Sequence, residues 1–253
     1  QEYETVPLSC VTSMRAPLSR YALHVATSRG ERALIAVASA ARALTEPKDH
    51  RHVGALAEAT GAHALRRLQD RMQAHPIGRQ ILEQRPLINS ATLPLERLGA
   101  CPQGSLGAAF ADFLRRHHFS HDERDDAVWM VDDADLAYVM QRYRQVHDLW
   151  HVLYDLPPTF LGEVALKWLE AAQTRLPMCA LGAVGGGARL SAAQHLLVAQ
   201  HVVPWAARHA LGGTDLMSVY YERELDKPIG DVRAALRLEL LPAGWAAEPP
   251  PHG

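Results

Sequence analysis

Apolar side chains recur along most of the chain at the three-to-four-residue spacing of amphipathic helices. Leu65, Leu68 and Met72 show this spacing within 60–74. Similar apolar patterns occur elsewhere, and a proline, a glycine or an acidic residue lies at or near the ends of each. These patterns predict helices over 51–59, 76–85, 105–117, 132–154, 158–175, 191–209 and 228–241. We find no alternating strand run, no hairpin dipeptide and no internal repeat. The sequence therefore predicts a single all-α domain over 1–253.

Segments without helical periodicity are expected to be irregular. The range 86–104 contains three prolines and two glycines, which predicts a long connection that packs on a site or carries a function. Shorter interruptions are expected at 46–49, 176–179 and 183–187. The two ends, 1–16 and 246–253, are expected to be irregular or disordered.

The range 31–44 is rich in alanine and apolar on nearly every side. A helix of this kind is predicted to be buried, and attachment to a membrane surface is the alternative. No apolar run in the chain approaches the roughly 20 residues that a membrane-spanning helix needs. The chain begins at Gln1 rather than Met, which is compatible with removal of an upstream targeting peptide.

Composition narrows the classes of function. The 253 residues are 48% hydrophobic, which is enough for one substantial core. The formal net charge of −2 lacks the basic excess of a nucleic-acid-binding protein, so nucleic acid is not expected as a partner. Cys10, Cys101 and Cys179 are widely spaced and odd in number, which disfavours both a disulfide framework and a cysteine zinc site.

The strongest chemical signal lies on the helix predicted over 132–154. Each helical residue turns by about 100°, which places His151 about 40° and Asp148 about 100° from His147. All three side chains are therefore predicted to share one face of the helix. Pro157 ends this helix, because it cannot donate to the helix and disfavours helical geometry just before it.

Glu163 follows about one turn into the helix predicted over 158–175. A tight antiparallel hairpin would return it towards the histidine face. The flanking residues are mostly apolar, and polar groups in such a framework are costly unless they are paired or bind a metal. The candidate metal ligands are therefore His147, Asp148, His151 and Glu163, whose nitrogen and oxygen atoms suit zinc or another first-row metal.

Two metalloenzyme classes with related motifs fit less well. A phosphohydrolase of the His-Asp type needs a further His upstream and an Asp downstream, and needs neither His151 nor Glu163. A protease of the zincin type carries glutamate as its general base at the position where this chain has Asp148.

Two other groups of polar residues have competing explanations. Lys167 lies four residues after Glu163 and three before Glu170, so an ion pair with either is favoured over contact with an anionic substrate. A cluster of histidines and acids further upstream is better explained as a solvated loop than as a second metal site, because no helical spacing organises it. This cluster comprises His117, His118, His121, Asp122, Glu123, Asp125 and Asp126.

The blocks around the candidate ligands resemble a known family. They are Tyr138–His151, Leu161–Ala171 and Leu176–Cys179, with supporting matches at Arg85–Pro86, Gly104–Gly107 and Tyr220–Arg223. These blocks are similar to the ubiquinone (coenzyme Q) biosynthesis protein family Coq-four, whose signature is His-Asp-x-x-His, eleven residues, then Glu. The signature fits without a gap at His147, Asp148, His151 and Glu163.

The resemblance implies a metal-dependent lyase of ubiquinone biosynthesis. Its substrate would be a polyprenylated 4-hydroxybenzoate intermediate that loses its C1 carboxyl, either simply or oxidatively with a hydroxyl placed at C1. The implied metal is Zn2+ held by the four motif residues, or iron or another redox metal if the step is oxidative. Asp148 and Glu163 are the candidates for proton transfer.

The resemblance also implies a location and partners. The family is mitochondrial, peripheral on the matrix side of the inner membrane, and part of a complex with other coenzyme Q biosynthesis enzymes; a homo-oligomer is compatible with this. The competing implication is a non-catalytic scaffold that binds a prenyl lipid and contains a structural metal. A polyprenyl tail further predicts an apolar groove or tunnel near the metal and attachment to the membrane surface by an apolar or amphipathic helix.

Overall fold

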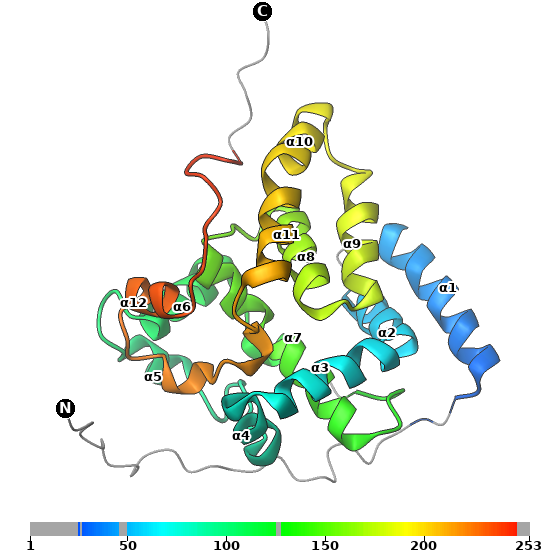
Figure 1. The fold of residues 1–253 in the computed structure, drawn as a ribbon, viewed down its shortest axis with the longest axis horizontal. Coiled ribbons are helices and arrows are strands. Elements are labelled where there is room, and N and C mark those ends of the chain that lie inside the picture. Colours follow the sequence, from blue (N-terminus) through cyan, green and yellow to red (C-terminus); the bar gives the residue numbers. More distant parts are fainter. Residues whose placement is uncertain (1–24, 26, 46–49, 125–127, 247–253) are drawn as a thin grey trace, which may run out of the picture.

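The computed structural model describes residue 25 and the ranges 27–45, 50–124 and 128–246, which form helices with no strand among them (Figure 1). The first half contains α1 (Arg29–Thr45), α2 (His50–Thr60), α3 (Ala62–Ala74), α4 (Pro76–Gln84), α5 (Leu95–Gly99) and α6 (Leu106–His117). The second half contains α7 (Ala134–Tyr154), α8 (Phe160–Thr174), α9 (Pro177–Gly187), α10 (Ala192–Leu197), α11 (Val203–Gly212) and α12 (Ile229–Ala235). Single 3₁₀ turns lie at His121–Arg124, Leu216–Ser218 and Tyr221–Arg223. The predicted all-α class is confirmed.

Helix α7 is buried on every side. Asp133 caps its first turn by accepting hydrogen bonds from the backbone N–H groups of Asp135 and Leu136. Asp155 ends it in the left-handed conformation, with φ of 53°. The helices α3, α4 and α6 contact α7, so its polar side chains must find partners inside the protein.

A five-residue link, 155–159, joins α7 to α8, in agreement with the predicted break at Pro157. Thr159 caps α8 by accepting a hydrogen bond from Gly162 N at 3.3 Å. A Cβ atom at Gly162 would lie only 1.9 Å from the carbonyl oxygen of Pro157. Glycine is therefore needed at the position directly before Glu163, where the link crosses the first turn of α8.

Two predicted interruptions fall at helix α9. The break predicted at 176–179 occurs, but it comprises only Arg175, with φ of 56°, and Leu176, and α9 begins at Pro177. The turn predicted at 183–187 is the end of the same helix. At Gly186 the helix packs closely on α8, because a Cβ there would lie 3.0 Å from Val164 Cγ2.

Three further predictions need correction. The connection 86–104 is not wholly irregular, because it contains α5 and buries Leu87, Ile88, Leu93 and Leu98. The helix predicted over 191–209 is interrupted by a π-helical turn, Val198–Val202, and continues to Gly212. Pro204, predicted near its last turn, lies in the first turn of α11. The helix predicted over 228–241 ends at Ala235.

Helix α1 forms as predicted, but the prediction that 31–44 is buried is wrong. The helix lies at the edge of the molecule (Figure 1) and contacts α2 on its inner side. Leu34 and Val37 are 73% and 71% exposed on its outer side. Apolarity on every side predicted burial, but only one side of α1 is covered. Among the described helices, none has both the length and the apolarity needed to cross a membrane.

The 3₁₀ turn Tyr221–Arg223 contacts α7 through buried polar side chains. Arg142, with 0% of its side chain exposed, pairs with Glu222 at 2.5 Å. Trp150 Nε1 donates to the hydroxyl of Tyr221 at 2.8 Å. Three predictions lie outside the described residues: the irregular end at 1–16, the break at 46–49 and the irregular end at 246–253. Of the last range, the structure describes only Ala246.

Candidate metal centre

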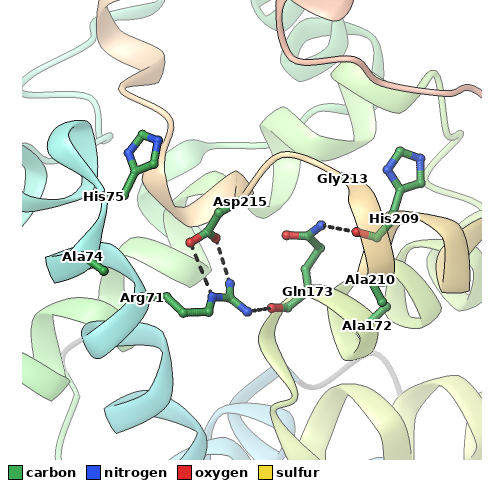
Figure 2. Close-up of a pocket in the computed structure, with 9 residues that line it drawn as sticks. All are labelled: Arg71, Ala74, His75, Ala172, Gln173, His209, Ala210, Gly213 and Asp215. Atoms are coloured by element: carbon green, nitrogen blue, oxygen red, sulfur yellow. Dashed lines mark hydrogen bonds and ion pairs between the residues drawn. The ribbon is translucent and has the colours of Figure 1, made fainter.

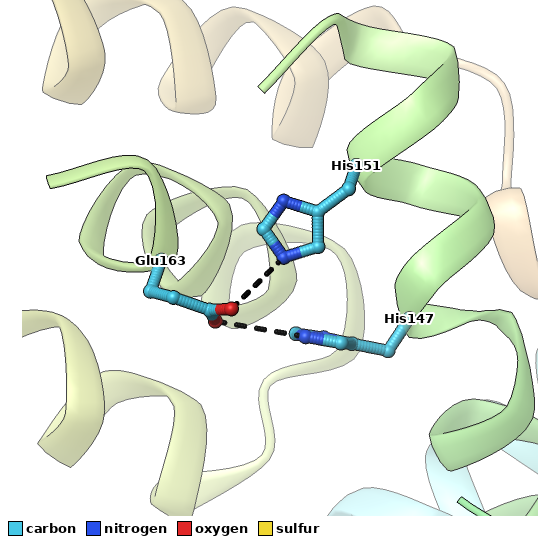
Figure 3. Close-up of side chains that lie close together, drawn as sticks. All are labelled: His147, His151 and Glu163. Carbon is cyan, nitrogen blue, oxygen red and sulfur yellow. Dashed lines mark hydrogen bonds and ion pairs between the residues drawn. The ribbon is translucent and has the colours of Figure 1, made fainter. Parts of the chain in front are cut away.

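Three of the four predicted ligand residues meet between α7 and α8 (Figure 3). His151 Nε2 lies 3.1 Å from Glu163 Oε1, and His147 Nε2 lies 3.6 Å from Glu163 Oε2. One ligand atom from each residue lies within 4.8 Å of the others. The two histidines are four residues apart on α7, so they share one side of the helix. Glu163 faces them from the first turn of α8.

The remaining nitrogen of each imidazole has a hydrogen-bond acceptor behind it. His151 Nδ1 lies 3.1 Å from the carbonyl oxygen of Leu156. His147 Nδ1 lies 2.6 Å from Glu170 Oε1. A carbonyl or carboxylate oxygen can only accept, so each Nδ1 carries the hydrogen. In the neutral rings both Nε2 lone pairs then face Glu163, which is the orientation that binds a metal.

The charge of Glu163 and the distances between the candidate ligand atoms are compatible with a bound metal cation. Burial would raise the pKa of Glu163, but His147 and His151 in their protonated form, through the hydrogen bonds of their Nε2–H groups and their charges, hold it well below its usual range. A tetrahedral zinc ion with bonds of about 2 Å separates its ligand atoms by about 3.3 Å. The two contacts of 3.1 and 3.6 Å to Glu163 lie on either side of that value.

The fourth predicted ligand, Asp148, lies beside this group. Its side chain is 3% exposed, and its Oδ1 is 4.0 Å from His147 Nε2. It does not belong to the set of ligand atoms within 4.8 Å of one another. The difference follows from the helix, because Asp148 is rotated by about 100° from His147. Its roles as a ligand and in catalysis stay predictions.

Glu170 is a residue of the centre that the sequence analysis assigned only to an ion pair. It is fully buried, and Lys167 Nζ contacts its Oε2 at 2.6 Å, so the predicted ion pair forms with Glu170. The hydroxyl of Tyr143 donates to the same oxygen at 2.8 Å. Burial would raise the pKa of Glu170, but the charges of Lys167 and His147 lower it to about 2. The seven-residue spacing from Glu163 was the available signal, because it places both carboxylates on one face of α8.

Aromatic side chains of α6 cover one side of the centre. The ring of Phe113 stacks on His151 with centroids 5.7 Å apart. His117 and Phe119 contact Phe113 in turn, with centroids 5.0 and 5.9 Å from it. Nothing in the local sequence pattern pointed to this contact, because α6 and α7 are distant in the chain.

The upstream histidine cluster forms no metal group among the described residues. His117 and His118 are exposed, in agreement with a solvated loop. His121 differs, because only 5% of it is exposed and it packs near Phe110 with ring centroids 6.3 Å apart. Asp125 and Asp126 lie outside the described residues.

A separate pocket of about 420 Å³ lies near α3, α8 and α11 (Figure 2). Arg71 pairs with Asp215 at 2.7 Å and donates to the carbonyl oxygen of Gln173 at 2.7 Å. Gln173 Nε2 in turn donates to the carbonyl oxygen of His209 at 3.1 Å. These polar groups satisfy one another, so they tie the three helices together.

The fold and the site define an all-α protein with two histidines and a glutamate converging from two consecutive helices. Residues 21–242 match the family model described as coenzyme Q (ubiquinone) biosynthesis protein Coq4. The chain therefore belongs to the Coq4 family, whose members take part in ubiquinone biosynthesis. The resemblance of the His-Asp-x-x-His blocks is thereby confirmed.

Individual relatives agree with this membership. The chain is 43% identical over 227 residues to the mitochondrial ubiquinone biosynthesis protein COQ4 homolog of Danio rerio, covering 90% of this chain and 83% of that protein. It is 40% identical over 237 residues to the human homolog, covering 94% and 88%. A crystal structure of a Nostoc punctiforme protein, 19% identical, superposes with a TM-score of 0.65 over 83% of this chain and 98% of that one. The last comparison shows a shared fold.

Proposed function

We propose that this chain is a metal-dependent lyase that removes the C1 carboxyl group from a polyprenylated 4-hydroxybenzoate intermediate of ubiquinone biosynthesis. The observation that supports the metal site is the convergence of His147, His151 and Glu163, with both Nε2 atoms facing the carboxylate. Three protein ligands are typical of catalytic zinc sites, whereas structural zinc sites have four. Membership of the Coq4 family supports a role in ubiquinone biosynthesis, and the candidate metal site supports metal-dependent chemistry.

Three residues of the centre are proposed metal ligands, and a fourth is proposed to transfer a proton. A bound zinc ion supplies Lewis-acid polarisation of a substrate oxygen. His147 and His151 would hold it from α7, and Glu163 would hold it from α8. Loss of carbon dioxide breaks the bond between C1 and the carboxyl carbon and leaves the electron pair on C1. Asp148, buried beside His147, then delivers the proton that this carbon needs.

An oxidative version of the reaction uses the same residues with a different metal. Dioxygen then supplies the hydroxyl oxygen that replaces the carboxyl group at C1, and its second oxygen atom leaves as water, with the two electrons supplied by an external two-electron reductant. Two histidines and one carboxylate also suit non-haem iron, which would take the place of zinc. Parallel assays with and without oxygen separate the two versions.

The experiment compares Glu163→Gln with the wild type on a soluble polyprenyl-hydroxybenzoate analogue. Glutamine keeps the shape of the side chain and removes the charge of a ligand. We expect reduced bound metal, loss of carbon dioxide release and a melting temperature near that of the wild type. Glu222→Gln, in the buried pair with Arg142, is the matched control. It should lower the melting temperature and leave the metal content of the folded protein unchanged.

Two results would contradict the proposal. A folded Glu163→Gln protein with undiminished carbon dioxide release removes the assigned role of Glu163. Unfolding of the wild type by a chelator, together with a much lower melting temperature of Glu163→Gln, indicates a structural metal, because site binding energy is then folding energy. That outcome favours the non-catalytic prenyl-lipid-binding scaffold.

The proposal includes peripheral attachment to the matrix side of the mitochondrial inner membrane, beside other coenzyme Q biosynthesis enzymes. The relatives named above are mitochondrial. Helices α1 and α9 contact each other and expose large apolar side chains, Leu34 and Val37 on α1 and Leu181 and Val184 on α9, and we take these side chains as one apolar face. Helix α9 contains no charged residue. Exposed apolar side chains on neighbouring helices are typical of a lipid or partner contact, and the tail of the substrate is expected to lie in lipid.

A further inference from the structure

The imidazole of His147 bridges two glutamates of α8. Its Nε2 faces Glu163 at 3.6 Å, and its Nδ1 contacts Glu170 Oε1 at 2.6 Å. The glutamates are seven residues apart, which is about 10 Å along a helix. The ring lies between them from the neighbouring α7. Glu163 has 37% of its side chain exposed, whereas Glu170 is fully buried.

We propose that Glu170 is a positioning residue for the metal centre. It accepts the hydrogen of His147 Nδ1, fixes that tautomer and so presents the Nε2 lone pair to the metal. The inference rests on the metal site of the proposed function and adds a residue outside the four-residue motif. Removing an acceptor of this kind from behind a metal-bound imidazole typically lowers metal affinity by about 10–100-fold.

The contacts of Glu170 explain why its carboxylate can do this. Oε2 accepts from Lys167 Nζ at 2.6 Å and from the hydroxyl of Tyr143 at 2.8 Å. With Oε2 occupied by two donors, the plane of the carboxylate is fixed and Oε1 is directed at His147. The aliphatic part of Lys167 packs near Gly182 of α9, where an added Cβ would lie 3.4 Å from it. The ammonium group is therefore held over Glu170 by the packing of α9 on α8.

The two imidazoles are supported differently. His151 Nδ1 contacts a neutral backbone carbonyl, that of Leu156, at 3.1 Å. His147 alone has a carboxylate behind it among the three ligands described above. A backbone acceptor is fixed by the link between α7 and α8, whereas Glu170 depends on side chains from α7 and α8. Side-chain substitutions can therefore remove the support of His147, whereas the support of His151 belongs to the main chain.

A purely structural ion pair between Glu170 and Lys167 is the competing explanation. Replacing a buried ion pair by apolar groups of similar volume is often neutral for stability, whereas removing one partner is destabilising. A structural pair therefore predicts effects on folding alone. A positioning role predicts changes in the tautomer of His147 and in zinc affinity, even in a variant that folds as well as the wild type.

The experiment uses the full chain with Glu170→Leu and Lys167→Met together, so that the acceptor behind His147 is removed and neither buried charge is left alone. The tautomer of His147 is read from the ¹⁵N chemical shifts of its ring in the metal-free protein, at an alkaline pH where free histidine is neutral. Zinc affinity is measured by competition with a chromophoric chelator. Glu222→Gln is the control, because it weakens a different buried ion pair, that of Glu222 with Arg142.

In the wild type we expect His147 to carry its hydrogen on Nδ1 and to leave Nε2 unprotonated. The double variant should show a mixture of tautomers and bind zinc about 10–100-fold more weakly. The Glu222→Gln control should change neither quantity. A folded double variant with unchanged tautomer and unchanged zinc affinity overturns the inference while leaving the metal site intact.

Two further results separate this inference from the proposed function. A wild type that binds no zinc refutes the proposed metal site, and the tautomer comparison still decides the role of Glu170. If the double variant does not fold, Glu170→Asp replaces it, because aspartate keeps the charge but withdraws the carboxylate by about 1.5 Å. Mixed tautomers in Glu170→Asp support the positioning role, and an unchanged Nδ1–H tautomer refutes it.

Discussion

Helices α7 and α1 relate polarity to burial in opposite ways. Helix α7 buries a guanidinium, a carboxylate and two imidazoles in the centre of the protein. Helix α1 exposes Leu34 and Val37 to solvent at the edge. Each polar group of α7 described above has a partner, whereas the outer side of α1 has none among the described residues. Burial therefore follows from the availability of partners, and apolarity alone does not decide it.

The comparison also indicates where function resides. Buried polar groups cost free energy unless their contacts are complete, so α7 is sensitive to the loss of any partner. Exposed apolar side chains contribute little to the stability of the isolated protein, so α1 should tolerate polar substitutions. Substitutions in α7 should therefore lower the free energy of unfolding strongly, whereas substitutions on the outer side of α1 should change it little.

The largest expected effect is the loss of a partner of α7. Glu222→Ala leaves the guanidinium of Arg142 buried and uncompensated, which should lower the free energy of unfolding by about 3–5 kcal/mol. Denaturant unfolding of the purified protein measures this change. Replacing both partners, as Arg142→Met with Glu222→Leu, should recover most of the loss. A single variant as stable as the wild type would show that Arg142 finds another partner.

A smaller effect is expected at the link between the two ligand-bearing helices. Gly162→Ala places a methyl group against the carbonyl oxygen of Pro157 and should displace the first turn of α8. We expect a loss of about 1–3 kcal/mol in unfolding free energy, with weaker zinc binding because Glu163 moves. Chemical denaturation and zinc titration test both. Gly187→Ala in α9, where nothing lies within 4 Å of an added Cβ, should cause neither change.

The smallest effect on stability is expected on the apolar face of α1 and α9. Leu34→Glu with Val184→Glu should change the unfolding free energy by no more than about 0.5 kcal/mol for each substitution. The same variant should lose binding to liposomes, which co-sedimentation measures. Leu211→Glu, at a 90% exposed residue of α11, is the matched control and should keep this binding. Full liposome binding by the double variant would argue against this face as the lipid contact.

The elements defined by local signals could be predicted from the sequence. Helix α7 ends before Pro157 as expected, and short polar side chains cap the helices: Asp133 caps α7, and Ser105 caps α6 by accepting from Ala108 N. The spacing of His147, His151 and Glu163 was sufficient to place them together, because each lies within two turns of a predictable helix boundary. Local capping and periodicity therefore account for both the all-α class and the core of the site.

The remaining features depend on contacts between distant segments. Gly186, near the end of α9, lies against Val164 of α8, whereas isolated glycine propensity predicts a turn there. The exposure of Leu34 depends on which side of α1 meets α2. The pairing of Arg142 with Glu222 joins residues 80 positions apart, which no periodic pattern records.

The short link between α7 and α8 also bears on how the chain folds. His151 and Glu163 are separated by 12 residues, whereas Arg142 and Glu222 are separated by 80. The entropy cost of loop closure is smaller for the shorter loop by about 1.7 kcal/mol. The ligands can therefore meet before the C-terminal segment docks, and local contacts of this kind favour rapid folding.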